Sequence, residues 1–593
     1  MGLKQAICLA ALATSATSRC YAPNPAFPVP SWPNGASTLR TAFQDLEKQY
    51  DTAIKAPKFE NTSFSVEVTS KTSTLWSYHH TAANLNPARP GDGNVSPDSI
   101  YRIASITKTF TTLAILYQQA AGNLSLDDPV TYYIPELNSS DYTLPWKDIT
   151  LRSLASQLSG IPREFAQSDI WNFFQDPTSI GLPPATGEGL PTCDEYNYYK
   201  PCNRSDLLTQ LKKSKPVFAP NQKSTYSNLN FELLGLVLEN ITKLPYAQII
   251  HNLIFTPLNM TSSSLTKPAS DVRAVLPLMP AGEPNYWDVN EGVQNPTGGI
   301  YTSSRDMGIY LRYILTHYNA LATGVNWFHP VSKGTGPHSF YGMPWEIFST
   351  EELLPESRRP VTFVTKSGGL PGYYSHIYLL EEYGLGISLF VGGNGAVFDE
   401  LHTPVTTDLI RAAEEAVWED MQSVYTGRFI PTEDYAHLNT TLTLATSPAK
   451  GLHLEQFISN STDVLAALFG GIMSAATSSH PRHHPKPKGQ GDPWHAQLTP
   501  TLLHANETAS SGEIYRVLPV LTQKPANAPV WEDDCVTDVD TMSYAGKAVN
   551  EMVFWFGEDE GDDLVVELPA WNVSLRRVGG REGRAMVVQK GDL

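Results

Sequence analysis

The alternation of apolar and polar residues predicts strands near both ends of residues 40–425 and helices between them. Residues 62–80 alternate around a polar turn at Lys71, which predicts a β-hairpin, and residues 365–393 return to the period of two and predict a second hairpin. From Ser105 to Ala121 the apolar residues recur at helical spacing, and a mostly helical middle follows. If the two end segments pair, the result is one mixed α/β layer of sheet and helices.

A helix over residues 404–425 is expected to end this first domain. The residues beyond it form short alternating runs, which predict a small β-rich domain with strands at residues 441–445, 514–520, 564–568 and 586–588. We therefore expect one domain over residues 19–430 and a second over residues 431–593.

Two stretches show no clear period. Residues 163–221 contain many aromatic, Pro and Gly residues, and the sequence leaves open whether they form a lid, a substrate wall or a solvated insertion. Residues 478–492 contain His480, His483 and His484, but the prolines among them prevent a preformed ligand cage. We expect a solvated loop there and no metal site.

Length and composition narrow the function classes. The 593 residues are 41% apolar and 17% charged, so the chain can bury a sizeable core. Sixty acidic and 42 basic residues leave a net charge of −18, which would repel a nucleic-acid backbone. No apolar run reaches the length of a membrane span. These features argue against a nucleic-acid partner and a membrane span, and the sequence does not fix the oligomeric state.

The N-terminus predicts export from the cell. Lys4, an apolar run and then small residues resemble a signal peptide over residues 1–18. Acceptor sequences for N-linked sugar are more frequent than chance placement would give, so we expect a secreted glycoprotein. They lie at Asn61, Asn94, Asn123, Asn138, Asn203, Asn240, Asn259, Asn439, Asn460, Asn506 and Asn572.

The cysteines fit an oxidising compartment. Cys193 and Cys202 are close enough in sequence for a local disulfide. Cys20 and Cys535 would then form a second pair. This second pair requires cleavage after Ser18, because cleavage after Ala22 would remove Cys20 and leave Cys535 free. No cysteine spacing resembles a zinc site.

Three short motifs carry candidate chemistry. Ser105 and Lys108 are three residues apart on the predicted helix, so a desolvated Lys108 can take the Ser105 proton. Alone, this spacing also fits a serine helix cap followed by a solvated lysine. Tyr226 and Asn228 precede an apolar run and can enter one cleft, where Tyr226 relays a proton and Asn228 holds a carbonyl.

The third motif is Lys366-Ser367-Gly368-Gly369, at the start of the second hairpin. Its glycines allow close substrate approach, and the Gly369 N–H can join that of Ser105 in an oxyanion hole. Lys333 begins a similar Lys-Gly-Thr-Gly sequence, but Pro337 follows and no alternating run adjoins it. We therefore prefer Lys366.

These motifs occur in the order typical of active-site serine β-lactamases and penicillin-binding proteins. Residues 40–425 resemble that family, and in particular its class C β-lactamase and esterase branch, in which Tyr takes the second-motif position. The whole chain is similar to secreted fungal β-lactamase-like proteins with an extra C-terminal β domain. Further matching segments are residues 123–129, 158–162, 257–260 and 297–300. Gln157-Leu158 departs from the usual His-Thr, and Asn259 replaces a usual Gly.

The resemblance implies an antiparallel sheet with helices on both faces, a helical subdomain and a serine hydrolase that needs no cofactor. Ser105 would be the nucleophile, Lys108 and Tyr226 the acid and base, and Asn228 and Lys366 would orient substrate. Ser367 keeps the hydroxyl that the family uses toward a substrate carboxylate. The resemblance implies a small-molecule or peptide acyl substrate, and ester, lactone, amide and β-lactam carbonyls all suit this machinery. A role in polyketide or peptide natural-product processing is a further hypothesis. An acyltransferase using the same serine and a non-catalytic binding protein are the alternatives.

Overall fold

The computed structural model describes two compact units of the chain. The described residues are 27–32, 37–166, 169–174, 176–187, 190–193, 200–280, 283–470, 494–521, 539, 542–557 and 564–578. One unit comprises residues 40–350 and 361–410. The other comprises residues 351–360, the described residues up to Leu39 and those from Arg411 onward.

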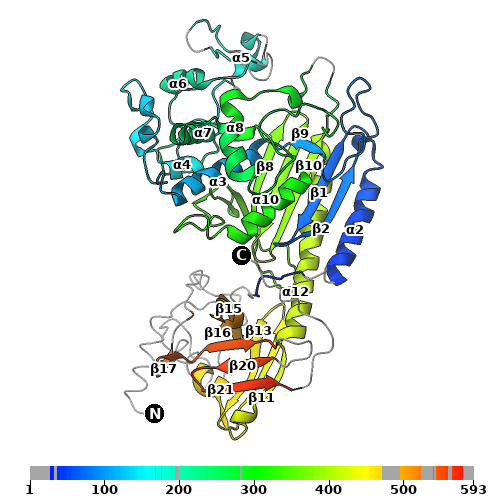
Figure 1. The fold of residues 1–593 in the computed structure, drawn as a ribbon, viewed down its shortest axis with the longest axis vertical. Helices are drawn as coiled ribbons and strands as arrows, with labels where there is room; N and C mark the ends of the chain where they lie inside the picture. Colours follow the sequence, from blue (N-terminus) through cyan, green and yellow to red (C-terminus); the bar gives the residue numbers. More distant parts are fainter. Residues whose placement is uncertain are drawn as a thin grey trace. The chain divides into compact units, whose positions relative to one another are not determined.

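An eight-stranded antiparallel sheet organises the larger unit (Figure 1), with strand order β2-β1-β10-β9-β8-β7-β6-β5. β1 pairs with both β2 and β10, so the N- and C-terminal segments of the unit are neighbours, as the sequence predicted. The strands are β1 (Ser63–Thr69), β2 (Thr74–His80), β5 (Ser332–Lys333), β6 (Ser339–Tyr341), β7 (Glu346–Thr350), β8 (Val361–Leu370), β9 (Tyr373–Leu380) and β10 (Leu385–Gly392).

Both predicted hairpins are confirmed, as β1–β2 and β9–β10. The second is part of a longer meander, because β8 pairs with β9 and carries the Lys366 motif. The expectation of a mostly helical middle was wrong for residues 332–350, which form β5, β6 and β7. These strands have two to five residues, too few for a clear alternation.

Helices cover both faces of this sheet. On one face the α2 residue Tyr50 packs edge-on against Phe64 of β1, with ring centroids 6.0 Å apart. On the other face Gly308 of α10 lies against Glu67 of β1, where an added Cβ would come within 2.1 Å of the carboxylate. Figure 1 shows α10 lying across the sheet. Residues 64 and 67 of one strand point to opposite faces, so the two helices sandwich β1.

A helical subdomain packs around α3 and α7, and its core joins that of the sheet. Eleven of the fourteen α3 residues are buried. The helices described are α2 (Ser37–Ala53), α3 (Thr107–Ala120), α4 (Leu151–Ala155), α5 (Ile170–Phe173), α6 (Arg204–Lys213), α7 (Leu229–Thr242), α8 (Tyr246–Ile250), α9 (Asn295–Gly298), α10 (Ser304–His317), α11 (Phe398–Thr403) and α12 (Leu409–Tyr425).

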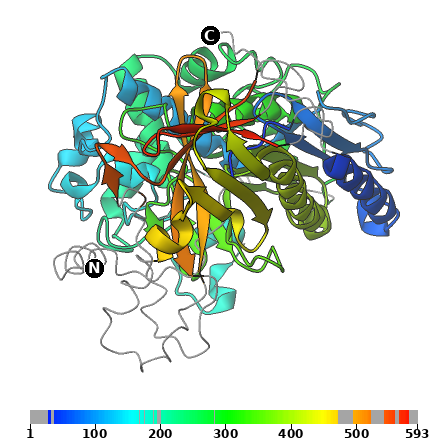
Figure 2. The same ribbon diagram turned by 90° about the horizontal axis from the view of Figure 1, so that it is seen from below.

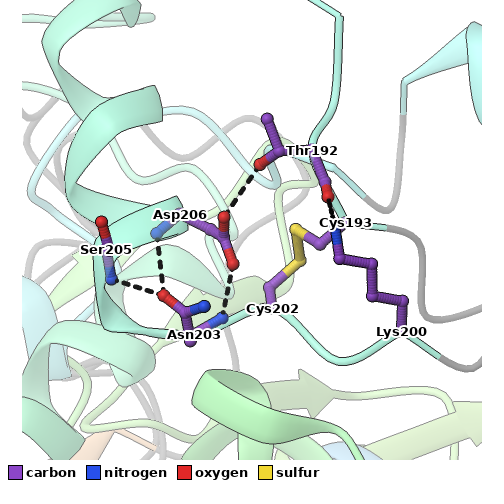
Figure 3. The surroundings of a disulfide bond; sticks show 7 residues. All are labelled: Thr192, Cys193, Lys200, Cys202, Asn203, Ser205 and Asp206. Carbon is purple, nitrogen blue, oxygen red and sulfur yellow. Dashed lines mark hydrogen bonds between the residues drawn. A yellow bond between two sulfur atoms is a disulfide. The ribbon is translucent and has the colours of Figure 1, made fainter.

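The predicted disulfide between Cys193 and Cys202 is present, with the Cα atoms 5.2 Å apart (Figure 3). It lies directly before α6. Asn203 caps this helix, accepting hydrogen bonds from the backbone N–H groups of Ser205 (2.8 Å) and Asp206 (3.2 Å). The Asp206 carboxylate in turn accepts from Thr192 at 2.9 Å. The disulfide and the capping box thus fix the same helix start.

The smaller unit is β-rich, as predicted. Nine of its described strands follow the order β12-β11-β21-β20-β19-β16-β15-β13-β14, and β12 also pairs with β13, so eight of these nine close into a ring. The described strands β17 (Ser543–Tyr544) and β18 (Lys547–Ala548) pair separately. Figures 1 and 2 show the nine strands in yellow to red. They are β11 (Gly427–Pro431), β12 (Thr441–Ser447), β13 (Gly451–Ser459), β14 (Thr462–Asp463), β15 (Trp494–Asn506), β16 (Ser511–Leu521), β19 (Glu551–Trp555), β20 (Val565–Leu568) and β21 (Val573–Arg577).

The predicted start of the last helix at Pro404 was wrong. Helical backbone begins at Phe398 in α11, passes through a π-helical turn at Pro404–Asp408 and continues as α12. Proline lacks an N–H, and the wider turn accommodates it within the helix. The predicted strand at 586–588 and the loop at 478–492 lie outside the described residues. Among the described helices, none combines the length and the apolarity needed to cross a membrane.

Candidate active site

Ser105 stands at an abrupt strand-to-helix turn. β3 (Ile100–Arg102) pairs with β4 (Tyr301–Ser303), and the chain then enters the short helix η2 (Ala104–Ile106) and α3. Ala104 is buried and has φ of 47°, a left-handed conformation that costs a non-glycine residue about 1–3 kcal/mol. The turn places Ser105 on the wall of a pocket, at the start of the helix.

Ser105 Oγ lies between two candidate proton acceptors. Lys108 Nζ donates to it at 2.9 Å, and the Tyr226 hydroxyl donates to it at 2.9 Å. Lys108 Nζ also donates to the Thr297 carbonyl at 3.0 Å, which fixes the ammonium beside the serine. The structure thus brings the first two predicted motifs together. The alternative for Ser-x-x-Lys, with the lysine in solvent, does not hold because Lys108 is completely buried.

The surroundings favour the proton-accepting forms of both groups. Burial lowers the pKa of Lys108 below its ordinary value, and the Lys366 ammonium adds to this effect against the opposing Tyr226. Burial alone would raise the pKa of Tyr226, but the charges of Lys108 and Lys366 outweigh it and leave the phenol pKa below its ordinary value. Lys108 and Tyr226 therefore lose their own protons at a pH closer to neutral than a solvated lysine or tyrosine does. Once deprotonated, either group can accept the Ser105 proton.

Gln157 holds the second motif in place. Its side-chain oxygen accepts from the Ser227 N–H and from the Asn230 side chain, both at 2.8 Å. Ser227 Oγ donates to the Pro162 carbonyl at 2.6 Å. Gln157 thus anchors the segment from Tyr226 to Asn228. The glutamine that stands here in place of the usual histidine therefore has a structural role.

Gly368 brings β8 against the backbone of the nucleophile. A Cβ at this position would come within 2.3 Å of the Ile103 carbonyl oxygen and 2.9 Å of the Ser105 N. Only glycine allows this approach. Gly369, the next residue, lines the pocket beside Ser105, and a Cβ on it would meet no described atom within 4 Å. Ser105 and Gly369 therefore border the same pocket.

Glu346 completes the third motif and was not singled out from the sequence. Its carboxylate accepts from Lys366 Nζ at 2.5 Å, and from the Ser367 N–H and Oγ at 2.9 and 2.7 Å. Lys366 Nζ lies 5.1 Å from the centroid of the Tyr226 ring. The motif therefore joins the nucleophile cluster through Lys366, with Glu346 as the counter-ion.

Asn228 lines the same pocket and is held by Glu164, another residue not singled out from the sequence. The Asn228 side-chain N–H donates to the Glu164 carboxylate, while Asn228 Oδ1 is buried and has no hydrogen-bond partner among the described residues. Burial raises the Glu164 pKa. The pocket has a volume of about 420 Å³ that includes open solvent. It is lined by Ala104, Ser105, Asn228, Tyr286, Val289, Glu291, Thr297, Gly298, Gly369 and Leu370.

A buried ion pair supports part of the pocket wall. Arg102 donates to Glu291 at 2.5 Å, and their side chains are only 1% and 6% exposed. The guanidinium also donates to the Tyr286 and Val289 carbonyls at 2.8 and 2.9 Å. Arg102 thus ties together the segment that forms this wall.

Family models match most of the chain. The model described as "Beta-lactamase" matches residues 60–409, and the model described as "Beta-lactamase-like-like, C-terminal domain" matches residues 417–579. The chain belongs to the β-lactamase family. It is similar to "Probable hydrolase M10" of Phoma sp., with 32% identity over 97% of this chain and 93% of the relative. It is 30% identical to "Beta-lactamase-like protein" of Arthroderma benhamiae, over 93% and 94% of the two chains.

A solved "Beta-lactamase/D-alanine Carboxypeptidase" from Yersinia pestis is 21% identical to this β-lactamase-family chain. It aligns with 64% of this chain and 99% of its own, at a TM-score of 0.48.

Other predicted positions of this β-lactamase-family chain fall outside the site. Lys333 is exposed on β5, at the sheet edge, which agrees with the preference for Lys366. Ten of the eleven glycosylation asparagines are exposed; Asn240 is half-buried and donates to the Tyr133 carbonyl at 2.7 Å. Cys20, Cys535, the predicted signal peptide and the histidine-containing loop lie outside the described residues.

Proposed function

We propose that the protein is a serine hydrolase that forms an acyl-enzyme at Ser105, on an ester, lactone, amide or β-lactam carbonyl. The observation that carries this proposal is the contact of Ser105 Oγ with both Lys108 Nζ and the Tyr226 hydroxyl, each at 2.9 Å. A serine hydroxyl becomes a strong nucleophile when a positioned base removes its proton. Membership of the β-lactamase family supports the same chemistry.

Acylation starts with the proton shared among these three side chains. When Lys108 or Tyr226 is deprotonated, Ser105 donates to it and attacks the carbonyl carbon. The Ser105 and Gly369 amides stabilise the negative charge on the carbonyl oxygen. The proton then passes to the leaving alcohol or amine, and Tyr226 is suited to deliver it because its hydroxyl already contacts Ser105 Oγ.

Deacylation repeats these steps with water as the nucleophile. The same basic groups accept a proton from water, and Ser105 leaves as the regenerated hydroxyl. An alcohol or amine in place of water would make the protein an acyltransferase. A role in trimming or releasing a polyketide or peptide natural product belongs to this proposal.

Turnover of a substrate panel tests the proposal. Aryl esters, lactones, anilides and a chromogenic cephalosporin are incubated with wild-type protein and with Ser105→Ala. We expect Ser105-dependent hydrolysis of at least one class. Added alcohol or amine that diverts the acyl group from water would indicate an acyltransferase. No turnover of any class, with Ser105 unmodified by acylating probes, would favour a non-catalytic binding protein and overturn the proposal.

We also propose that the mature protein is a secreted glycoprotein that begins after Ser18. Ten exposed acceptor asparagines and the Cys193–Cys202 disulfide support this. N-terminal sequencing of protein secreted by a eukaryotic host should read from Arg19, and glycosidase treatment should lower its mass. Retention in the cell with an intact Met1 would contradict this.

A further inference from the structure

The donors of the third motif, Lys366 and Ser367, already bind a carboxylate of the protein itself, that of Glu346. Lys366 Nζ, Ser367 N–H and Ser367 Oγ all donate to Glu346, at 2.5, 2.9 and 2.7 Å. Lys366 also donates to the Ser367 carbonyl at 2.9 Å. The donors that would recognise a substrate carboxylate next to the oxyanion site are therefore engaged.

Both members of this pair are charged near neutral pH. Burial alone would lower the pKa of Lys366, but the Glu346 charge outweighs it and leaves the pKa above its ordinary value. Burial alone would raise the pKa of Glu346, but Lys366 and the Ser367 donors leave it below its ordinary value. The Lys366 side chain is 1% exposed and that of Glu346 is 29% exposed. The ammonium is therefore shielded from solvent, whereas its counter-ion is partly exposed.

A substrate carboxylate would meet this arrangement unfavourably. To reach Lys366 and Ser367 it must displace Glu346, and if Glu346 stays it must lie beside a like charge. Three hydrogen bonds, all from buried or partly buried donors, oppose displacement. We propose that Glu346 acts as a built-in occupant of the anion site and restricts the enzyme to substrates whose leaving group is uncharged at this position.

This inference rests on the proposed hydrolase function and gives it a substrate class. The substrates are neutral esters, lactones or amides, and not acyl compounds that carry a carboxylate beside the scissile bond.

Arg163 is another cation near the site and offers a substrate carboxylate a different binding position. Its guanidinium lies 4.6 Å from the centroid of the Tyr226 ring, its side chain is 63% exposed, and its Nε is 3.5 Å from Glu164. A carboxylate bound at Arg163 would evade the discrimination by Glu346.

A pair of matched aryl esters tests the inference: methyl 3-acetoxybenzoate and 3-acetoxybenzoate. They share the acyl group and differ in a leaving-group carboxylate. We expect wild-type kcat/KM for the neutral ester to exceed that for the anionic ester by about tenfold or more after correction for their different uncatalysed rates. In Glu346→Gln this ratio should fall by about tenfold or more, because the substrate carboxylate then serves as counter-ion to the buried Lys366. Glu415→Gln, which removes an exposed charge on α12, is the matched control and should keep the wild-type ratio.

The outcomes separate this inference from the proposed function. Equal wild-type turnover of the two esters, or an unchanged ratio in Glu346→Gln, would overturn the inference and leave the hydrolase proposal standing. Absence of turnover for both esters and the whole panel would overturn the hydrolase proposal itself. If Glu346→Gln folds poorly, as judged by its unfolding midpoint, Glu346→Ala is assayed with added formate. Formate should raise the neutral-to-anionic ratio of kcat/KM in this variant by occupying the site at Lys366, and a ratio that formate leaves unchanged in folded protein would overturn the inference.

Discussion

The contact between β8 and the nucleophile turn gives the sharpest structural prediction, through Gly368→Ala. The added Cβ would lie 2.3 Å from the Ile103 carbonyl oxygen, 2.6 Å from Ser375 Oγ and 2.9 Å from Ser105 N. Two of these atoms belong to the backbone, so rotation of a side chain cannot relieve the clash. The strand must move away from Ser105, and the two oxyanion amides would separate.

The expected loss has two parts. Overpacking of a closely packed site costs about 1–3 kcal/mol of folding free energy. Misplacement of one oxyanion donor lowers kcat by about 10²–10³-fold. Gly369→Ala is the matched comparison, because a Cβ there meets no atom of the described residues within 4 Å and the amide is retained. It should lose much less activity than Gly368→Ala.

Two assays measure these parts separately. The kcat for the best ester of the panel reports the oxyanion site, and urea unfolding reports stability. We expect Gly368→Ala to lose kcat at temperatures where it remains folded. Wild-type kcat in folded Gly368→Ala, or an equal loss in the two alanine variants, would refute the assignment of this strand edge to the oxyanion site.

Three further predictions follow from the same geometry. Lys108→Met should lower kcat by about 10²–10⁴-fold. In wild type, kcat/KM should rise with pH through the lowered pKa values of Lys108 and Tyr226, because the deprotonated base is the active form, and a flat profile from pH 5 to 9 would contradict this. Cys193→Ser should lower the free energy of unfolding by about 2–3 kcal/mol in urea titrations, since the disulfide closes a short loop. Equal stability of the wild type under reducing and oxidising conditions would contradict this contribution of the disulfide. Glu291→Ala should cost about 3–5 kcal/mol, because it leaves Arg102 buried and unpaired; a loss below 1 kcal/mol would show that Arg102 finds other compensation.

Local patterns made part of this structure predictable. The β1–β2 hairpin follows from strict alternation around Lys71, and α3 follows from apolar residues at helical spacing that end at a turn. Ser105 and Lys108 were predicted to be neighbours because three residues on a helix bring side chains to one side, and they are. Chemistry that depends on such short spacings is accessible from one sequence.

Contacts between distant residues were not predictable in the same way. Glu346 and Lys366 are 20 residues apart and meet because β7 pairs with β8, and β7 was not anticipated. Arg102 and Glu291 are 189 residues apart in the sequence and meet only in the folded structure. A lone glutamate has no local signature that marks it as a counter-ion. The partners of each motif therefore had to come from the three-dimensional structure.

The central claim is that Ser105 is an activated nucleophile. Mass spectrometry of the intact protein after incubation with a fluorophosphonate tests it most directly, in wild type and in Ser105→Ala. Wild type should gain the mass of one adduct, peptide mapping should place it on Ser105, and the variant should gain none. An unmodified wild type, or an adduct that persists in Ser105→Ala, would contradict the account.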